Sequence, residues 1–570
     1  MLETSTGDKI KIPSKRQFCA LLPFALLYTI FIIFADLEKA EQLGVIRNVL
    51  RIFFCMVICY AVQLLLCFLI SGRKFLAAKI PFMAKLPKQH RRQGKWYVYL
   101  LFFCVCFVSY LPFFLMYYPT WFNNDAIWQM EQILGLAPKS NHHPYFHTMI
   151  MGVFIRLGYR LFGNETDAVA FYTFWQIFIM AMVYAFVLYQ LYKRGTRILW
   201  LFLALLFYAV LPVNGIQTLC MGKDEFFIAA LLVFSWAAAM AVRQEKKYPE
   251  EKKFFYHILC CVSGLLVCLL RSNGIFIFLG TMFFWLISDI CKKKFAKGSS
   301  LRAATLKKYA CILGVLVCFG IYHGPVLHLL QVEPPDTIEG LTMPVQHVMC
   351  AYLKGGSLTP EEVEMIRQVV PLEGLEEYYN PYLFDPMKAR IREAGNQQVI
   401  EEEKWEYFKL WLRLGIRNPL QYVVAQVRQT MGYWAYRVKD YQYIYGEYFM
   451  VDNPFGVTAE RKFFTYDDSL KMDEYLKNFR DLFNKVWSLG LTTWLMLFAL
   501  AYAVYARRNV MICIPYVMLF LSLMLAAPVY NEFRYTYGMF VAMPFILSDS
   551  FGESGSSKTG EKGEDDEKVV

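Results

Sequence analysis

The stretch PTWFNNDAIWQMEQILGLAPKSNHHPYFHT, residues 119–148, is the part of the chain around which the rest is interpreted. It directly follows a long apolar run, yet it carries an acid, Asp125, and the triplet His142-His143-Pro144. A polar stretch at the end of a membrane-spanning run needs a physical reason, because polar groups inside a bilayer are costly. We therefore predict a functional loop at a membrane surface.

The composition is that of a polytopic membrane protein. Over 570 residues, 57% are hydrophobic, 17% aromatic and only 19% charged, and the mean hydropathy is +0.33. These values exclude an ordinary soluble domain. The net charge of +12 comes from short basic clusters between apolar runs, which orient helices in a membrane, so we expect membrane lipid and no nucleic acid as a partner.

Two further features fit this class. The first apolar run, Cys19 to Ala35, has no small-residue cleavage site after it and is interpreted as a retained helix. Most of the 15 cysteines fall inside apolar runs, where a thiol acts as a small hydrophobe. The cysteine spacing predicts neither a disulfide framework nor a zinc site.

Apolar runs of about 20 residues are long enough to cross a bilayer as helices. The chain has about twelve such candidates by this rule. They lie near residues 18–35, 49–71, 97–117, 166–192, 198–214, 225–242, 254–270, 275–291, 309–329, 484–506, 509–529 and 536–549.

Lysine and arginine set the predicted orientation, because cytoplasmic loops carry an excess of both. If the basic segments are cytoplasmic, every alternate connection is extracytoplasmic. Both termini then lie on the cytoplasmic side of a plasma membrane. These segments are Lys9 to Arg16, Arg73 to Lys95, Lys193 to Arg197, Arg243 to Lys253, Lys292 to Lys308, and Arg507-Arg508.

Two extracytoplasmic connections are long. In the first, 119–165, the semi-apolar segment from Pro144 to Phe162 predicts helices lying along the membrane surface. The second, 331–480, is acidic and rich in tyrosine, with amphipathic helices expected around 360–370, 386–412 and 418–438. It is long enough to fold as a unit of its own.

The expected fold class is an all-α polytopic membrane protein, and its predicted parts follow from these runs. No internal repeat is visible, which disfavours a transporter built from inverted repeats. The parts are an N-terminal region with two extra helices (1–96), a transmembrane core (97–330), an external helical domain (331–480), C-terminal transmembrane helices (481–550) and a disordered cytoplasmic tail (551–570).

Four polar groups of residues fall on the predicted external face. Lysine and arginine there run against the positive-inside bias unless they bind something anionic. A lipid phosphate fits, since arginine offers a planar donor fork and lysine a point charge. The groups are Asp125 with His142 and His143, Lys223 with Asp224, Arg271 with Asn273, and Glu532 with Arg534.

Each group also has a purely structural interpretation. Asp125 after Asn123-Asn124 is a reasonable helix N-terminus signal. Lys223 and Asp224 could pair with each other. Arg271 and Arg534 could extend to lipid headgroups.

The histidines leave two structural alternatives open. His142 and His143 could be hydrogen-bonded loop residues with no ligand. His147 follows His143 at the four-residue spacing of a metal-binding helix face. The segment HPYFH lacks a glutamate base, however, and Pro144 occupies the first turn, which disfavours a zinc protease.

The order of motifs resembles the GT-C class of membrane glycosyltransferases. In that class an early acid in the first external loop precedes surface-lying helices and a His-Pro element. Here Trp121-Phe122-Asn123-Asn124-Asp125 precedes His142-His143-Pro144. The resemblance implies a GT-C-like bundle and transfer of a sugar from a polyprenyl-phosphate donor to a glycan, lipid or protein acceptor.

A longer set of motifs is similar to the bacterial family known as domain of unknown function 6020. The similarity covers roughly residues 95 to 548. The set comprises Asp125, His142-His143-Pro144, Lys223-Asp224, Arg271-Ser272-Asn273-Gly274, Met343-Pro344-Val345-Gln346, Asn418-Pro419, Thr430-Met431-Gly432-Tyr433-Trp434 and Glu532-Phe533-Arg534-Tyr535.

One departure from the protein O-mannosyltransferase branch matters. That branch has two adjacent acids in this loop, whereas here Asp125 lies between Asn124 and Ala126. The need for a divalent metal, magnesium or manganese, and the class of acceptor therefore stay open.

The mechanistic hypothesis gives each residue a role. Asp125 acts as the base on the acceptor hydroxyl. Lys223, Arg271 and Arg534 stabilise the leaving lipid phosphate. Inversion is expected, although Asp224 and Glu532 keep a covalent nucleophile open. The residues expected to bind substrate are His142, His143, Asp224, Asn273, Gln346 and Glu532.

Two other functions remain possible on sequence alone. A transporter or flippase for a lipid-linked or anionic substrate needs ionisable groups near the bilayer midplane. A structural or signalling protein whose external domain binds a partner leaves the outward-facing lysine and arginine unexplained.

Overall fold

All regular elements in the part of the chain that the structure describes are helices. The computed structural model describes residues 13–37, 44–79, 92–122, 124–244, 250–291, 299–436, 438, 453–458 and 463–552. Extended pairing within these ranges is confined to isolated bridges. The predicted all-α class is confirmed, whereas most of the predicted disordered tail lies outside the described residues.

Six helical segments are long and apolar enough to cross a membrane, which indicates a membrane protein. A seventh span is added if the bent pair α23 (Tyr466–Val486) and α24 (Leu489–Tyr505), whose axes meet at 48°, is one crossing. The six lie in α1 (Lys15–Phe34), α3 (Val45–Lys79), α5 (Trp96–Met116), α8 (Glu165–Lys193), α11 (Lys223–Gln244) and α14 (Ser299–Ile321) with its continuation through η2 (Tyr322–Val326) and α15 (Leu327–Leu329).

The predicted number of about twelve spans is not confirmed. The predicted span 198–214 is broken, because α9 (Ile198–Ala209) ends before Pro212, which begins the short helix α10 (Pro212–Gln217). Three other apolar helices are shorter than a full crossing over their apolar part: α12 (Glu250–Leu270), α13 (Gly274–Cys291) and α25 (Ile514–Ala526). Helix α26 (Phe533–Phe551) is not among the candidate spans.

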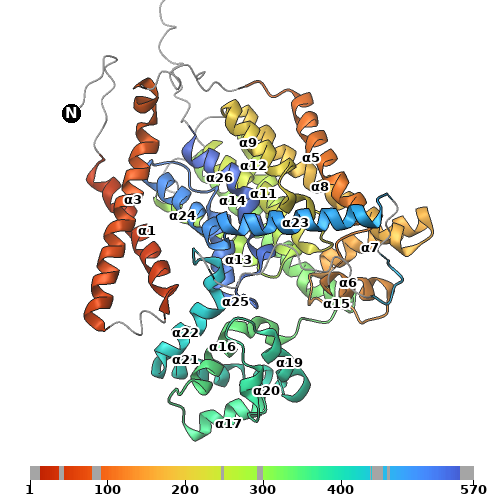
Figure 1. The fold of residues 1–570 in the computed structure, drawn as a ribbon, viewed down its shortest axis with the longest axis vertical. Coiled ribbons are helices and arrows are strands. Elements are labelled where there is room, and N and C mark those ends of the chain that lie inside the picture. The colour runs from red at the N-terminus through yellow and green to blue at the C-terminus, as the bar shows by residue number, and fades with distance from the viewer. Residues whose placement is uncertain are drawn as a thin grey trace, which may run out of the picture.

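The apolar helices form one bundle with a continuous core (Figure 1). Its buried tyrosines satisfy their hydroxyls with partners inside the bundle. Tyr208 donates to the Val541 carbonyl at 2.5 Å, and Tyr184 and Tyr537 share a 2.8 Å hydrogen bond. Tyr537 also lies 2.9 Å from Asn214 Oδ1, which fixes the break before α11 against α26.

The segment from η3 (Thr337–Leu341) to α22 (Pro419–Thr430), called the external segment after its predicted side of the membrane, carries a hydrophobic core of its own. Buried Phe384, Met387, Ile391 and Leu414 belong to a cluster separate from the bundle core. In Figure 1 this segment lies below the bundle. Its elements are η3 (Thr337–Leu341), α16 (Thr342–Leu353), α17 (Pro360–Val369), α18 (Leu375–Tyr378), α19 (Asp385–Ala394), α20 (Gln398–Glu402), α21 (Lys404–Arg417) and α22 (Pro419–Thr430).

Helix α23 is not part of this core, although it begins within the range predicted for this domain, 331–480, and ends six residues beyond it. It lies along the bundle, with the Phe483 ring 6.0 Å from that of Phe540 on α26. The amphipathic helix predicted around 386–412 is three helices, since Gly395 and Glu403 end two of them.

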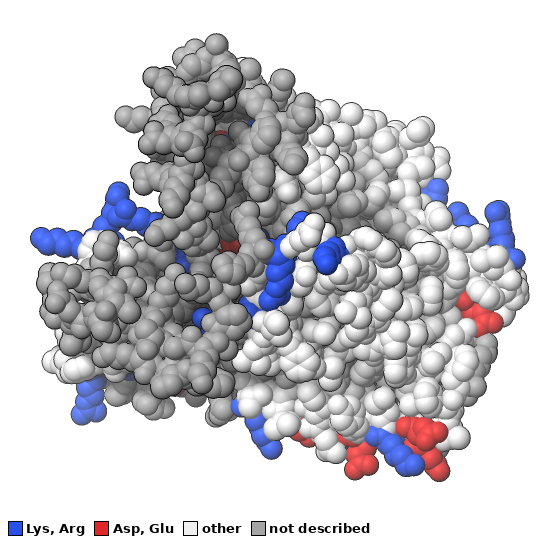
Figure 2. Space-filling model, turned by 90° about the horizontal axis from the view of Figure 1, so that it is seen from above, with Lys and Arg blue, Asp and Glu red and all other residues white. Residues whose placement is uncertain are grey.

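The end of the bundle opposite to the external segment is where the basic segments are predicted. Of these, Lys9 to Arg16, Arg73 to Lys95, Arg243 to Lys253 and Lys292 to Lys308 lie wholly or partly outside the described residues. Figure 2 views this end from above and shows lysine and arginine side chains on the described surface, with aspartate and glutamate side chains among them towards one edge. That distribution is expected of a cytoplasmic end. The orientation itself stays a prediction.

Candidate functional site

Three short backbone pairings gather loops that are far apart in sequence. The first joins the end of α5 to the segment before α11. Trp121 N donates to the Leu219 carbonyl at 3.2 Å, and Met221 N donates to the Trp121 carbonyl at 3.0 Å. The amide of Gln176 on α8 holds the same segment through the carbonyls of Thr218 and Cys220. This pairing brings Asp125 and Lys223 together.

The second pairing joins the histidine loop to the start of the external segment. Asn141 N donates to the Glu333 carbonyl and Glu333 N to the Lys139 carbonyl, both at 2.8 Å. The third joins the external segment to the loop before α26, where Phe384 N donates to the Pro528 carbonyl at 2.9 Å. Gly432 lies against the Tyr530 carbonyl, where a Cβ atom would stand only 2.2 Å away.

Asp125 lies at the centre of the gathered loops. It occupies the first turn of α6 (Asn124–Leu134), where a negative charge is favoured by the helix dipole. Its Oδ2 accepts from Lys223 Nζ at 2.8 Å and from Arg534 Nη1 at 3.0 Å. Burial raises the pKa of the carboxyl, but the charges of Lys223 and Arg534 outweigh it and hold that pKa well below its usual range.

His143 completes this group through a contact with Lys223. Its Nδ1 lies 2.9 Å from Lys223 Nζ, so it accepts from the ammonium and the ring proton is on Nε2. The ring stacks on Trp128 of α6, with centroids 5.5 Å apart. His143 is buried, and its Nε2 has no hydrogen-bond partner among the described residues. That N–H is therefore a buried donor whose hydrogen-bonding capacity the described residues leave unused.

Arg271 and Asp224 form a second ion pair beside the first. Arg271 Nη1 donates to Asp224 Oδ1 at 2.5 Å. The guanidinium lies 5.0 Å from the centroid of the Tyr535 ring, and Arg534 lies 5.2 Å from the same centroid. Gly274 permits the tight turn after α12, since a Cβ there would stand 1.9 Å from the Val267 carbonyl. Tyr535 thus connects the two arginines.

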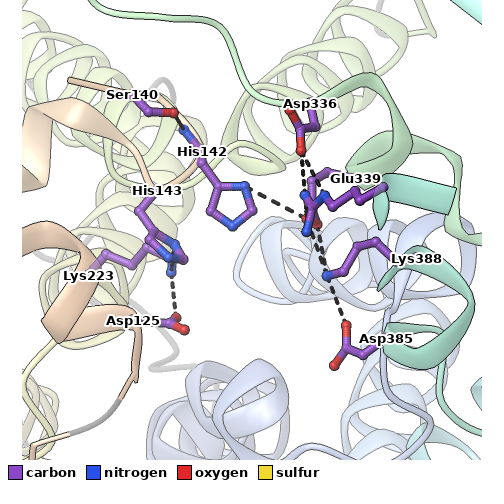
Figure 3. A network of polar contacts seen from close by, with 10 residues as sticks. Asp125, Ser140, His142, His143, Lys223, Asp336, Glu339, Asp385 and Lys388 are labelled. Atoms are coloured by element: carbon purple, nitrogen blue, oxygen red, sulfur yellow. Dashed lines mark hydrogen bonds and ion pairs between the residues drawn. The ribbon is translucent and has the colours of Figure 1, made fainter. Parts of the chain in front are cut away.

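His142 connects this site to the external segment (Figure 3). Its Nδ1 lies 3.8 Å from Glu339 Oε1, and the pKa of its imidazole is lowered, mainly by burial. Glu339 in turn accepts from Arg392 at 2.6 Å and pairs with Lys388 at 3.2 Å. Glu339 is therefore the charged hub between the histidine loop and α19.

Two of the residues predicted to bind substrate lie elsewhere. Asn273 donates to Ser522 Oγ of α25 at 2.8 Å. Gln346 donates to the Asn380 carbonyl and to Gln429, which itself holds the Ala527 carbonyl. Both side chains fasten helices together, so their predicted binding roles have no support from their contacts.

The structural alternative in which Lys223 and Asp224 pair with each other is not the arrangement in the structure. Lys223 pairs with Asp125 and Asp224 pairs with Arg271, because successive side chains at the start of α11 point about 100° apart. Glu532 lies 3.6 Å from Arg534 Nε and helps to orient that guanidinium.

His147 contacts protein groups through both ring nitrogens. Its Nδ1 lies 3.1 Å from Gln129 Oε1 and its Nε2 2.9 Å from the Tyr172 hydroxyl. No three His, Cys, Asp or Glu side chains within the described ranges gather closely enough to hold a metal ion. The Asp125 carboxylate is already paired with the Lys223 and Arg534 side chains. The residues present therefore do not fit magnesium or manganese.

Buried histidines make the stability of the fold sensitive to acid. Burial lowers the pKa of His143 to about 2, of His147 to about 3 and of His347 to about 4. An unfolded histidine has a pKa near 6.5, so below that pH the unfolded chain binds three protons that the folded chain does not. The free energy of unfolding should then fall by up to about 4 kcal/mol per pH unit, three times about 1.4.

The measurement is the thermal unfolding midpoint of the chain in detergent between pH 7 and 5. The midpoint should drop as pH falls, and the drop should be smaller in His347→Phe, which removes one titrating group from the external core. A midpoint that is flat over this range would contradict the assignment.

Several site residues were missed by the sequence interpretation. Trp128 lies three residues after Asp125, on the same helix face, and that spacing was an available signal. Glu339, Lys388 and Arg392 carried no local signal, because their contact with the histidine loop depends on the packing of α19 and η3.

Comparison with known proteins places most of the site inside one family. A model described as "Family of unknown function (DUF6020)" matches residues 137–564. His142, His143, Lys223, Arg271 and Arg534 fall within the match, whereas Asp125 lies just before it. Comparisons with curated proteins and with solved structures found no match. Because the matched residues make up most of its length, the chain belongs to the DUF6020 family.

Proposed function

We propose that this protein is a membrane glycosyltransferase of the GT-C type, acting on the extracytoplasmic face of a plasma membrane. It transfers a sugar from a polyprenyl-phosphate donor to a glycan, lipid or protein acceptor. The observation that carries the proposal is the Asp125 carboxylate held between Lys223 and Arg534 at the meeting point of three loops. A base and two phosphate-binding cations are the groups that this reaction requires.

The proposed reaction is a single displacement. The acceptor oxygen bonds to the anomeric carbon while its proton passes to Asp125. The bond from that carbon to the lipid phosphate breaks, and its electron pair leaves with the phosphate oxygen. Arg534 and Lys223 stabilise the negative charge that develops there. Displacement in one step inverts the configuration at the anomeric carbon.

A carboxylate with a low pKa is a weak base, so Asp125 must become more basic before it can take a proton. Binding of the donor can cause this change. Lys223 and Arg534 reduce the affinity of the carboxylate for a proton as long as both contact it. A bound phosphate competes for the same two cations. Asp125 then regains basicity only when donor is present, which couples proton transfer to donor binding.

The external segment is proposed to cover the site and select the acceptor. It contacts the histidine loop through Glu339 and His142 and the loop before α26 through Phe384. In the proposed topology the chain crosses the membrane about twelve times, and both termini lie in the cytoplasm.

Arg271 provides a test of donor binding. We expect Arg271→Ala to weaken binding of a polyprenyl-phosphate sugar about tenfold, because a guanidinium hydrogen bond to an anion contributes about 1.5–3 kcal/mol. Donor affinity is measured by titration of the detergent-solubilised protein. Asp224→Asn, which keeps the guanidinium, is the control and should lose less. Unchanged affinity in Arg271→Ala would mean that Arg271 only anchors a helix end.

Glu339 provides a test of acceptor selection. Glu339→Gln removes the charge that holds Arg392 and Lys388 and faces His142. We expect the acceptor KM to rise several-fold while donor affinity is unchanged. Glu364→Gln, which removes an exposed acid paired with Arg367, is the matched control. An equal change in both variants would exclude a specific role for Glu339.

The chief rival function is a transporter or flippase for a lipid-linked or anionic substrate. The buried carboxylate of Glu225, which accepts from Gln217 inside the bundle, is the kind of group that transport uses. Purified protein in vesicles with a radiolabelled polyprenyl-phosphate sugar separates the two functions. Label transferred to an acceptor supports the transferase. Label that changes leaflet with its donor intact supports transport and contradicts the proposal.

A further inference from the structure

Helix α21 presents an apolar face that nothing in the described structure covers. Trp405, Phe408, Leu412 and Ile416 lie on one side of the helix at spacings of three and four residues. Ile416 is 75% exposed and Trp405 is 64% exposed. The opposite side of α21 packs into the external core through Leu410 and Leu414.

This face continues onto the neighbouring helix. Leu420 and Val423 of α22 are exposed as well, and α21 and α22 are joined at Asn418 and Pro419. A row of exposed apolar side chains across two helices is larger than the isolated apolar residues normal for a soluble surface. It therefore needs an apolar environment.

The position of α22 indicates which environment this is. Gln426 of α22 donates to the Met524 carbonyl at 2.7 Å, so α22 rests on the C-terminal end of the apolar helix α25. There Leu525 is itself 69% exposed and faces outward from the bundle. Figure 1 shows α22 and α21 following directly below α25. The apolar face thus lies next to the end of an apolar helix whose exposed side chains we expect lipid to cover.

The charge of α21 supports the same environment. Residues Lys404–Arg417 contain four basic side chains and one acid, Glu406, which leaves a net charge of +3. Arg413 and Arg417 share the Glu362 carboxylate of α17, and Lys409 pairs with Glu406. A helix with aromatic and aliphatic residues on one face and a basic rim lies in a membrane interface and is attracted by anionic headgroups. Tryptophan is enriched at that depth. Pairing with a second copy through this face would bring two basic rims together.

We propose that α21 is a membrane-surface helix that seats the external segment on the extracytoplasmic leaflet, with its apolar face in the headgroup region of anionic lipid. The proposal depends on the chain being a membrane protein and is independent of the transferase proposal. Its function is mechanical, because it fixes the height of the external segment above the bilayer.

The test uses the full chain in vesicles of phosphatidylcholine and phosphatidylglycerol. Ile416→Cys is labelled with an environment-sensitive fluorophore, and the signal of the identically labelled wild-type chain is subtracted. Glu361→Cys is the control, because it is exposed on α17, which lies far from the bundle in Figure 1. Thermal unfolding midpoints check that both variants are folded.

The expected result is a blue-shifted emission at position 416 and quenching by nitroxide-labelled lipid several-fold stronger than at position 361. Equal quenching of both positions by aqueous iodide, with no effect of nitroxide lipid at 416, would overturn the proposal. Protection at 416 that depends on protein concentration and ignores nitroxide lipid would instead indicate a second copy, and would overturn it too.

Discussion

Asp125→Asn should abolish sugar transfer and leave donor binding intact or tighter. The amide keeps the shape of the carboxylate but cannot take the acceptor proton, and loss of general base catalysis typically costs about 10²–10⁴ in rate. The same change releases Lys223 and Arg534 from their shared partner. Both cations are then free for the lipid phosphate. A fall in kcat without a rise in donor Kd is the signature of a base that competes with the donor.

The measurement is single-turnover transfer of radiolabelled sugar by the purified variant, together with donor titration. Glu131→Gln, on the same helix, is the matched control and should behave as wild type. Transfer by Asp125→Asn at the wild-type rate would remove Asp125 from the reaction. A loss of rate with an equal loss of donor affinity would assign it a structural role.

The helices were predictable wherever one physical property dominates. Long apolar stretches such as Trp96–Met116 and Glu165–Lys193 have no alternative to a helix in a membrane, because every backbone group must be paired there. The predicted length of a helix was wrong where a single residue interrupts an apolar run. Pro212 ends the continuity of the span predicted over 198–214, and no hydropathy average contains that information.

The sequence predicted which residues would gather better than it predicted their contacts. Sorting loops by side placed Asp125, Lys223, Arg271 and Arg534 on one face, and the structure brings all four together. It could not say that Lys223 and Asp224 have different partners, because pairing depends on the rotation of α11. Nor could it place Gln346, whose contacts with Gln429 arise from the packing of α16 on α22.

Arg534→Gln should weaken donor binding about tenfold to a hundredfold and shift the pH dependence of transfer. The affinity loss follows from removing a charged hydrogen bond worth about 1.5–3 kcal/mol. The pH shift follows from Asp125, whose pKa is held low partly by Arg534. Without that charge the pKa of Asp125 rises towards its ordinary value. Because transfer needs the deprotonated base, the acid-side fall in rate should move to higher pH.

The pH profile separates this role from a structural one. Arg156→Gln, on the exposed face of α7 (Tyr145–Phe162), is the matched control and should change neither donor Kd nor the acid limb. A weaker donor Kd with an unshifted acid limb would mean that Arg534 binds phosphate without influencing Asp125. An unchanged Kd would exclude Arg534 from the donor site altogether. Since the Arg534 guanidinium contacts the Asp125 carboxylate and lies against the Tyr535 ring, only a change in both quantities fits a cation shared between base and leaving group.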